Sequence, residues 1–371
     1  MKYLISFLFL ALAFSMKSEA KVTLPSILGD NMVLQQQAEV KLWGKARPNA
    51  TVTVKTSWNG QTYKSSSDGK GGWSLTVSTP VAGGPYKITF NDGELLTLQN
   101  VLIGEVWFCS GQSNMEMPMG GFDRQPVRGT NDIIAKAKPS TPIRMYTTDS
   151  KDGRWVRQFS KTPVEDCQGE WLENTPVNVS HISAVSYYFA RYIQEVLEVP
   201  VGIVVSTWGG SRIEAWMSRE SIKPFSSIDL AVRGFLWYQG ESNRDNADLY
   251  QSLMPAFVAD LRAKWGRGEL PFYFVQIAPF DYEGADGTSA ARLREVQLQN
   301  MKDIPNSGMV TTMDVGHPVF IHPVDKETVG NRLAYWALAQ TYGMKGFGYA
   351  PPVYKSMEIQ ENKIYINFDN A

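Results

Sequence analysis

Short alternating runs of apolar and polar residues fill the chain from residue 21 to residue 100. Gly, Asn, Asp and Pro separate these runs, which are KVTLP, MVLQQ, EVKLWG, TVTVKTSW, WSLTVS, YKITF and LLTLQ. A period of two bounded by turn residues is typical of half-buried strands. The pattern therefore predicts a small antiparallel β-sandwich-like domain over residues 21–100. It contains no cluster of catalytic residue types, so we expect a packing or sugar-contacting role for it.

From Val101 onwards the apolar runs are longer and nearly continuous, and helical patterns lie between them. The runs are LIGEVWFCS, VGIVVSTWGG, GFLWYQGES, PFYFVQIAPF and MVTTMD. The helical patterns cover residues 181–199, 246–265, 291–302 and 326–342. The first places Val185, Phe189, Ile193 and Val196 on one face, and Pro255 interrupts the second. Buried strands that alternate with helices predict an α/β fold with a mostly parallel central sheet over residues 101–348.

The two ends of the chain have patterns of their own. Residues 1–20 combine a basic start, an apolar run and the small residues Ser18 and Ala20, which is the pattern of an export signal. The run is too short for a comfortable membrane span, so we expect cleavage and a secreted or periplasmic protein; an uncleaved anchor is the alternative. Residues 349–371 are β-like again, and we expect them to be the start of a C-terminal β region truncated at Ala371.

Charge and cysteine content exclude several classes of partner. The 371 residues carry 36 Lys and Arg against 37 Asp and Glu, a net charge of −1. This balance gives no reason to expect nucleic acid or an anionic membrane surface as a partner. Cys109, Cys167 and the three histidines show no metal-ligand spacing, so we expect no metal site. A Cys109–Cys167 disulfide is compatible with export but does not follow from sequence.

Polar residues and glycines lie where the predicted parallel strands end. Their ends read CSGQSN, TWGGS, YQGESN, APFDY and DVGHP. Because open α/β sheets bind ligands at the carboxyl ends of their strands, Ser113 in GQSN is a candidate nucleophile. Met115 stands where a G-x-S-x-G elbow has its second glycine, and the serine follows the first strand, too early for an α/β-hydrolase. A turn-capping serine is the alternative.

The remaining groups needed for acyl transfer have several candidates. His181, His317 and His322 are the histidines, and we favour His322 as the base because the segment after it leads directly into a helix. The glycines of Trp208-Gly209-Gly210-Ser211 offer backbone N–H groups for an oxyanion. The side-chain amides of Gln239 and Asn243, near the end of the third strand, are further candidate donors. Glu241 either braces its loop or takes part in chemistry, and no second carboxylate supports glycosidase-type catalysis.

Four ordered blocks give this chain a family resemblance. GEVWFCSGQSNMEM, STWGGSRIEAW, RGFLWYQGESN and IHPVDKETVGNRLA resemble the sialate O-acetylesterase family of SGNH-type hydrolases. LPSILGDNMVLQQ and AGGPYKI are similar to the N-terminal β domain of those enzymes. The resemblance implies a three-layer SGNH-hydrolase-like fold and removal of an O-acetyl group from a sugar through an acetyl-enzyme, without a cofactor.

The same resemblance implies roles for individual residues. Ser113 would be the nucleophile, His322 its base, and the backbone N–H groups of Ser113 and Gly210 the oxyanion hole, completed by the amide of Asn243 or Gln239. Substrate contacts would come from Gln112, Asn114, Trp208 and Glu241.

The sequence departs from the family pattern at two places. An aspartate is expected three residues before the histidine, but Val319 stands there. Asp314 is the alternative partner for His322, although we favour a Ser–His dyad with a backbone carbonyl behind the imidazole. The connection over residues 222–233 is also shorter than is usual in the family.

Three functions stay open at the level of sequence. Deacetylation of sialic acid comes first, and deacetylation of xylan or another polysaccharide is the rival within the same chemistry. A non-catalytic carbohydrate-binding protein on an esterase-like scaffold is the alternative from another class. The oligomeric state is open.

Overall fold

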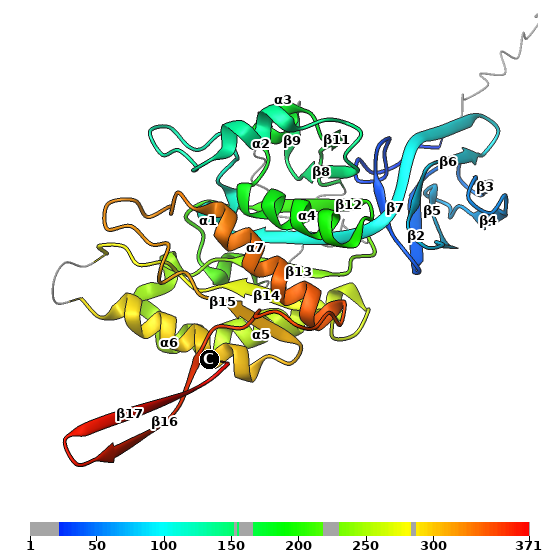
Figure 1. Cartoon of the computed structure of the whole chain (residues 1–371). Coiled ribbons are helices and arrows are strands. Elements are labelled where there is room, and N and C mark those ends of the chain that lie inside the picture. The colour runs from blue at the N-terminus through cyan, green and yellow to red at the C-terminus, as the bar shows by residue number, and fades with distance from the viewer. Residues whose placement is uncertain (1–21, 152–153, 156–165, 218–229, 283–286, 371) are drawn as a thin grey trace, which may run out of the picture.

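One long strand joins the two main parts of the molecule in the computed structural model, which describes residues 22–151, 154–155, 166–217, 230–282 and 287–370 (Figure 1). This strand, β7 (Leu95–Gly111), contains both the LLTLQ and the LIGEVWFCS run. Its first half pairs antiparallel with β6 (Gly83–Asn91), and its second half enters the parallel sheet. The expectation of two separate strands is wrong, because the polar pair Gln99-Asn100 lies within the strand instead of forming a turn.

The antiparallel part packs two small sheets around an apolar core. β2 (Glu39–Lys45) pairs with β5 (Gly72–Ser78), while β3 (Thr51–Thr56) pairs with β4 (Thr62–Ser66) and with β6. The short β1 (Val33–Gln35) runs parallel to β7. Val40, Val52 and Phe90 are fully buried between them, as alternation predicts. The sequence pattern missed β4, whose residues TYKSS are polar and largely exposed.

The central sheet has the strand order β11-β8-β12-β7-β13-β14-β15. The strands not yet described are β8 (Ile143–Thr147), β11 (Trp171–Glu173), β12 (Val201–Thr207), β13 (Gly234–Tyr238), β14 (Phe272–Val275) and β15 (Ser307–Val310). All neighbours run parallel except β11, which is antiparallel to β8. The mostly parallel sheet is as predicted, but two strands were missed. β11 has only three residues, and the buried Arg144 interrupts the apolar pattern of β8. β15 ends at Val310, so residues 311–314 of the MVTTMD run are not part of the strand.

Helices cover both faces of this sheet (Figure 1). α4 (Ala184–Leu197) and α7 (Lys326–Trp336) pack on the face that carries Trp107 and Cys109. α5 (Ala247–Trp265) and α6 (Ser289–Asp303) pack on the face that carries Phe108 and Trp237. Alternate residues of one strand therefore enter opposite cores. The predicted α/β three-layer fold is confirmed.

Two helix expectations need correction. The pattern over residues 181–199 divides into α3 (Pro176–His181) and α4, because the Ser183 side chain caps a new helix at Ala184. His181 consequently ends a helix instead of beginning one. Val196 is 36% exposed and does not belong to the buried face. Pro255 lies inside α5 without interrupting it.

Further elements complete the fold. These are α1 (Ser113–Glu116), α2 (Thr130–Lys136), η1 (Ile213–Trp216), η3 (Glu241–Asn246), η4 (Ala337–Thr341), β9 (Ser150–Lys151) and β10 (Arg154–Trp155). The C-terminal β16 (Val353–Gln360) and β17 (Lys363–Asp369) form an exposed hairpin that projects from the body (Figure 1). Cys109 and Cys167 are buried free thiols and form no disulfide. The predicted export signal and residues 222–229 of the short connection lie outside the described residues.

Candidate active site

A glycine turn presents Ser113 at the carboxyl edge of the sheet. β7 ends at Gly111, and Ser113 is the first residue of α1. Gly111 has φ +140°, and a Cβ atom there would lie 2.1 Å from the backbone oxygen of Tyr238 on the neighbouring strand. Only glycine fits this backbone position, which lets the chain turn tightly and place the serine at the sheet edge.

Ser113 and His322 form a hydrogen-bonded pair. The distance between Ser113 Oγ and His322 Nε2 is 2.9 Å. On the other side of the ring, His322 Nδ1 lies 2.6 Å from Oε1 of Gln125. Because a carbonyl oxygen can only accept, Nδ1 carries the proton and Nε2 is left as the acceptor for the serine hydroxyl. This is the tautomer that a general base needs.

The surroundings of His322 favour the uncharged imidazole. Burial, followed by the positive charge of Lys326, lowers the pKa of His322 to about 4. The ring of Phe122 packs against the imidazole with 5.2 Å between ring centroids, on the same turn that positions Gln125. The histidine can therefore accept a proton over the whole neutral range.

Asp314, the alternative partner for His322, does not support the imidazole. Both of its carboxylate oxygens accept hydrogen bonds from Arg332, at 2.7 and 2.6 Å. That pairing holds the pKa of Asp314 below its usual range. The carbonyl expected behind the imidazole comes from the Gln125 side chain and not from the backbone. His317 bonds to backbone N–H groups within its own loop, at Val319 and Phe320.

Two backbone segments beside the nucleophile offer candidate oxyanion donors. Ser113 opens α1, so its N–H has no acceptor within the helix. The Gly209 N–H donates to Glu116 Oε2 at 2.7 Å, and a Cβ atom on Gly209 would lie 3.7 Å from the Ser113 Cβ. Gly210 follows at φ +73°. Of the two glycines, Gly210 is thus the one whose N–H is not engaged by Glu116.

The amides predicted to complete the oxyanion hole serve another purpose. Gln239 donates to the Ser211 carbonyl and to Asn243 Oδ1, and Asn243 donates to Glu214 Oε2. Both residues are fully buried. They lock the loops after β12 and β13 together, and the expectation that one of them reaches the substrate is not supported.

Of the four residues predicted to touch substrate, only Trp208 is exposed, at 42%. Gln112, Asn114 and Glu241 are buried, and each uses its side chain within the protein. Gln112 Oε1 accepts from the Gly240 N–H at 3.3 Å, and Asn114 donates to Glu241 at 2.6 Å. These three residues therefore shape the site from behind and do not line its surface.

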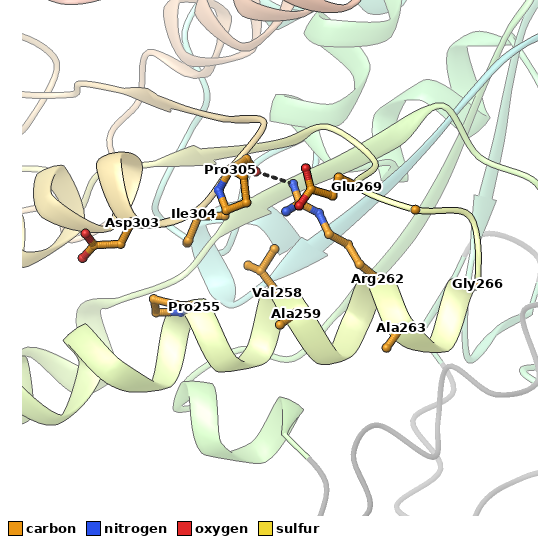
Figure 2. A pocket seen from close by; sticks show the side chains of 11 residues that line it. Pro255, Val258, Ala259, Arg262, Ala263, Gly266, Glu269, Asp303, Ile304 and Pro305 are labelled. Atoms are coloured by element: carbon orange, nitrogen blue, oxygen red, sulfur yellow. Dashed lines mark hydrogen bonds between the residues drawn. The ribbon is translucent and has the colours of Figure 1, made fainter.

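The cavity in Figure 2 lies away from these groups. It has a volume of about 530 Å³ and is lined by α5 and by the segments 266–269 and 303–305. Arg262 crosses it and donates to the Pro305 carbonyl at 2.8 Å. None of the site residues lines this cavity, so its size gives no reason to move the site there.

Similarity to known proteins agrees with the geometry. Residues 103–338 match the family model described as carbohydrate esterase, sialic acid-specific acetylesterase, which is more than half of the chain. The chain belongs to this family. Its members are carbohydrate esterases, so the chain is a hydrolytic esterase of that type.

Individual relatives of this carbohydrate esterase cover most of its length. The human sialate O-acetylesterase is 28% identical over 405 residues, which span 92% of this chain and 75% of the relative. The mouse sialate O-acetylesterase is 26% identical over 437 residues, with 92% and 77% covered. A crystal structure of a carbohydrate acetylesterase from Xanthomonas citri superimposes with a TM-score of 0.84 at 33% identity, covering 94% of this chain and 82% of that one.

Two observations concern metals and membranes. Within residues 22–151, 154–155, 166–217, 230–282 and 287–370, no group of three or more His, Cys, Asp or Glu side chains could hold a metal ion. Among the helices of that same part of the chain, none is long and apolar enough to span a bilayer.

Proposed function

We propose that this protein removes O-acetyl groups from sialic acids, with Ser113 as nucleophile and His322 as general base. The observation that carries the proposal is the 2.9 Å hydrogen bond between Ser113 Oγ and His322 Nε2, with Nδ1 held by Gln125. Family membership supplies the substrate class. An assembled nucleophile–base pair argues against a purely sugar-binding protein.

The reaction proceeds in two halves. As Oγ attacks the acetyl carbonyl carbon, Nε2 takes the hydroxyl proton, and the N–H groups of Ser113 and Gly210 stabilise the tetrahedral oxyanion. The C–O bond to the sugar then breaks, and the proton passes from Nε2 to the sugar oxygen. Water, deprotonated by the same nitrogen, then attacks the acetyl carbon of the acetyl-enzyme. The bond from this carbon to Oγ breaks, acetate leaves, and Nε2 returns the proton to Oγ.

Gln125 replaces the aspartate of a Ser–His–Asp triad. Its carbonyl oxygen keeps the proton on Nδ1 in the resting state and accepts from the imidazolium when Nε2 becomes protonated. A neutral amide stabilises that cation less than a carboxylate does. It also leaves the pKa of the resting imidazole low, so the histidine is already in its basic form.

Acetate release from O-acetylated sialic acid and from acetylated xylan tests this proposal. Wild type should release acetate faster from the sialic acid, and Ser113→Ala should abolish release, while Ser252→Ala, an exposed serine on α5, should match wild type. Faster release from xylan would move the substrate to a polysaccharide. Equal rates for wild type and Ser113→Ala would exclude the serine mechanism.

We also propose that residues 1–20 direct export and are then removed, on the basis of their sequence pattern. N-terminal sequencing of the protein from the culture medium or the periplasm should begin near Lys21. A start at Met1 would contradict cleavage.

A further inference from the structure

The residue after the nucleophile, Asn114, connects three segments of the site. Its Nδ2 donates to Glu241 Oε1 at 2.6 Å and to the Ile321 carbonyl at 3.1 Å, and its Oδ1 accepts from Lys326 Nζ at 2.5 Å. Both N–H bonds and the oxygen of the amide are therefore used inside the protein. One partner, Ile321, directly precedes His322, so the amide joins the serine segment to the histidine segment.

Two opposite charges are buried on either side of this amide. Lys326 is fully buried at the start of α7, with its ammonium 5.5 Å from the centroid of the Tyr238 ring. Glu241 is 3% exposed, and within the described residues its Oε2 has no hydrogen-bond partner. Burying such charges is expensive, and a buried pair seldom adds to stability relative to apolar side chains. Stability therefore does not explain why both are present.

The charges fix the orientation of the amide. The N–H side of Asn114 faces the Glu241 carboxylate, and its oxygen faces the Lys326 ammonium. If the amide were rotated by half a turn, its N–H groups would face the ammonium and its oxygen would face the carboxylate. In the fixed orientation the second N–H points to the Ile321 carbonyl. The charges thus determine a hydrogen bond that positions the backbone next to His322.

We propose that Asn114, Glu241 and Lys326 are a positioning unit for the esterase reaction: the two buried charges orient the amide, and the amide holds the backbone next to His322 so that the imidazole stays within reach of Ser113. This inference rests on the proposed function of Ser113 and His322. The other titratable groups around the unit are Tyr238 at the end of β13, Tyr250 on α5 and His322. Two nearby carboxylates are engaged elsewhere: Glu116 with Gly209, and Asp325 with the Thr328 N–H and Arg128.

Burial disfavours both charges of the pair, and the attraction between Lys326 and Glu241 opposes this effect. Burial lowers the pKa of Lys326 to about 7, and Glu241 counteracts that shift. Burial also raises the pKa of Glu241. Lys326 in turn contributes to the lowered pKa of His322. Removing the ammonium should consequently raise the pKa of His322.

The experiment compares Lys326→Met, Glu241→Gln, the double variant and Asn114→Leu with wild type. The readouts are kcat and KM for O-acetylated sialic acid, the pH profile of kcat/KM, the melting temperature, and the pKa of His322 from imidazole NMR. Asn114→Leu should lower kcat about 100-fold with KM changed less than about twofold, because a misplaced base mainly affects the chemical step. Lys326→Met should move the acidic limb of the kcat/KM pH profile to higher pH and raise the pKa of His322 measured by NMR. Lys138→Met, an exposed lysine, should change neither.

The double variant separates positioning from stability. A single variant leaves one buried charge without its counterpart and is destabilised, whereas the double variant removes both charges and should regain most of the lost melting temperature. In the double variant, the acidic limb of the kcat/KM pH profile should stay at higher pH and the pKa of His322 should stay raised. A double variant with wild-type kcat and a wild-type His322 pKa would overturn the proposal, as would a Lys326→Met protein with an unchanged pKa. The NMR readout does not require activity, so failure of the proposed function would be seen separately, as no acetate release by wild type.

Discussion

Replacing Gln125 by leucine removes the acceptor behind the catalytic imidazole at nearly constant volume. In the native protein His322 Nδ1 lies 2.6 Å from Gln125 Oε1, and this bond must also hold the imidazolium that forms during attack. A hydrogen bond to a charged group contributes about 1.5–3 kcal/mol, which corresponds to a loss of roughly 10- to 150-fold in kcat. The loss should be smaller than that of an aspartate from a triad, about 10⁴-fold, because the amide carries no charge.

Steady-state kinetics with an O-acetylated sugar measures this loss, with the melting temperature as a check on folding. Gln125→Glu should keep most of the activity at neutral pH and raise the pKa of His322, because it adds a negative charge beside the ring. Asp314→Asn is the matched control: Asp314 binds Arg332, so kcat should change less than about threefold through any local rearrangement. A Gln125→Leu protein with wild-type kcat, or an Asp314→Asn protein as inactive as His322→Ala, would refute the reasoning.

Three further predictions concern pH, backbone geometry and thiols. Because the pKa of His322 is lowered from 6.5 to about 4, kcat/KM should fall only as pH drops through about 4, and an acidic limb near 6.5 would contradict the burial argument. Gly111→Ala should lower the free energy of unfolding in urea by about 1–3 kcal/mol, because its Cβ atom would overlap a backbone carbonyl. A Cβ atom at Gly69 has open space, so Gly69→Ala is the control, and equal urea midpoints for the two variants would exclude the steric cause. Cys109 and Cys167 should react with a thiol reagent only after denaturation, because both are buried and burial raises the pKa of their thiols to about 12 and about 11. If neither reacted in denaturant, the two would form a disulfide.

The sequence predicted those parts of the site that lie at the ends of parallel strands. Parallel strands present their carboxyl ends on one edge, so GQSN after β7 and TWGGS after β12 had to lie together, and the structure places Ser113 beside Gly209. The choice of His322 agrees with its bond to the serine. Periodicity was less informative where an element is very short, as in β11, or carries polar residues, as in β4 and β8.

Partners that depend on loop placement could not be predicted. Gln125 lies in a loop between α1 and α2, and no spacing rule connects an amide there with a histidine 197 residues later. Asp314, the alternative partner for His322, follows β15, but the strand ends at Val310 and the carboxylate accepts hydrogen bonds from Arg332. Likewise, Gln239 and Asn243 have the right chemistry for oxyanion donors, yet they bind each other. Whether a polar side chain faces the substrate or a neighbouring loop is decided by tertiary packing.

Trapping of the covalent intermediate tests the central claim most directly. The protein is mixed with an O-acetylated substrate, quenched in acid within one turnover, digested and examined by mass spectrometry. The account predicts one acetyl group on the peptide that contains Ser113, and none in the Ser113→Ala protein. Acetate release by Ser113→Ala at the wild-type rate, or an acetyl group on a different residue, would contradict it.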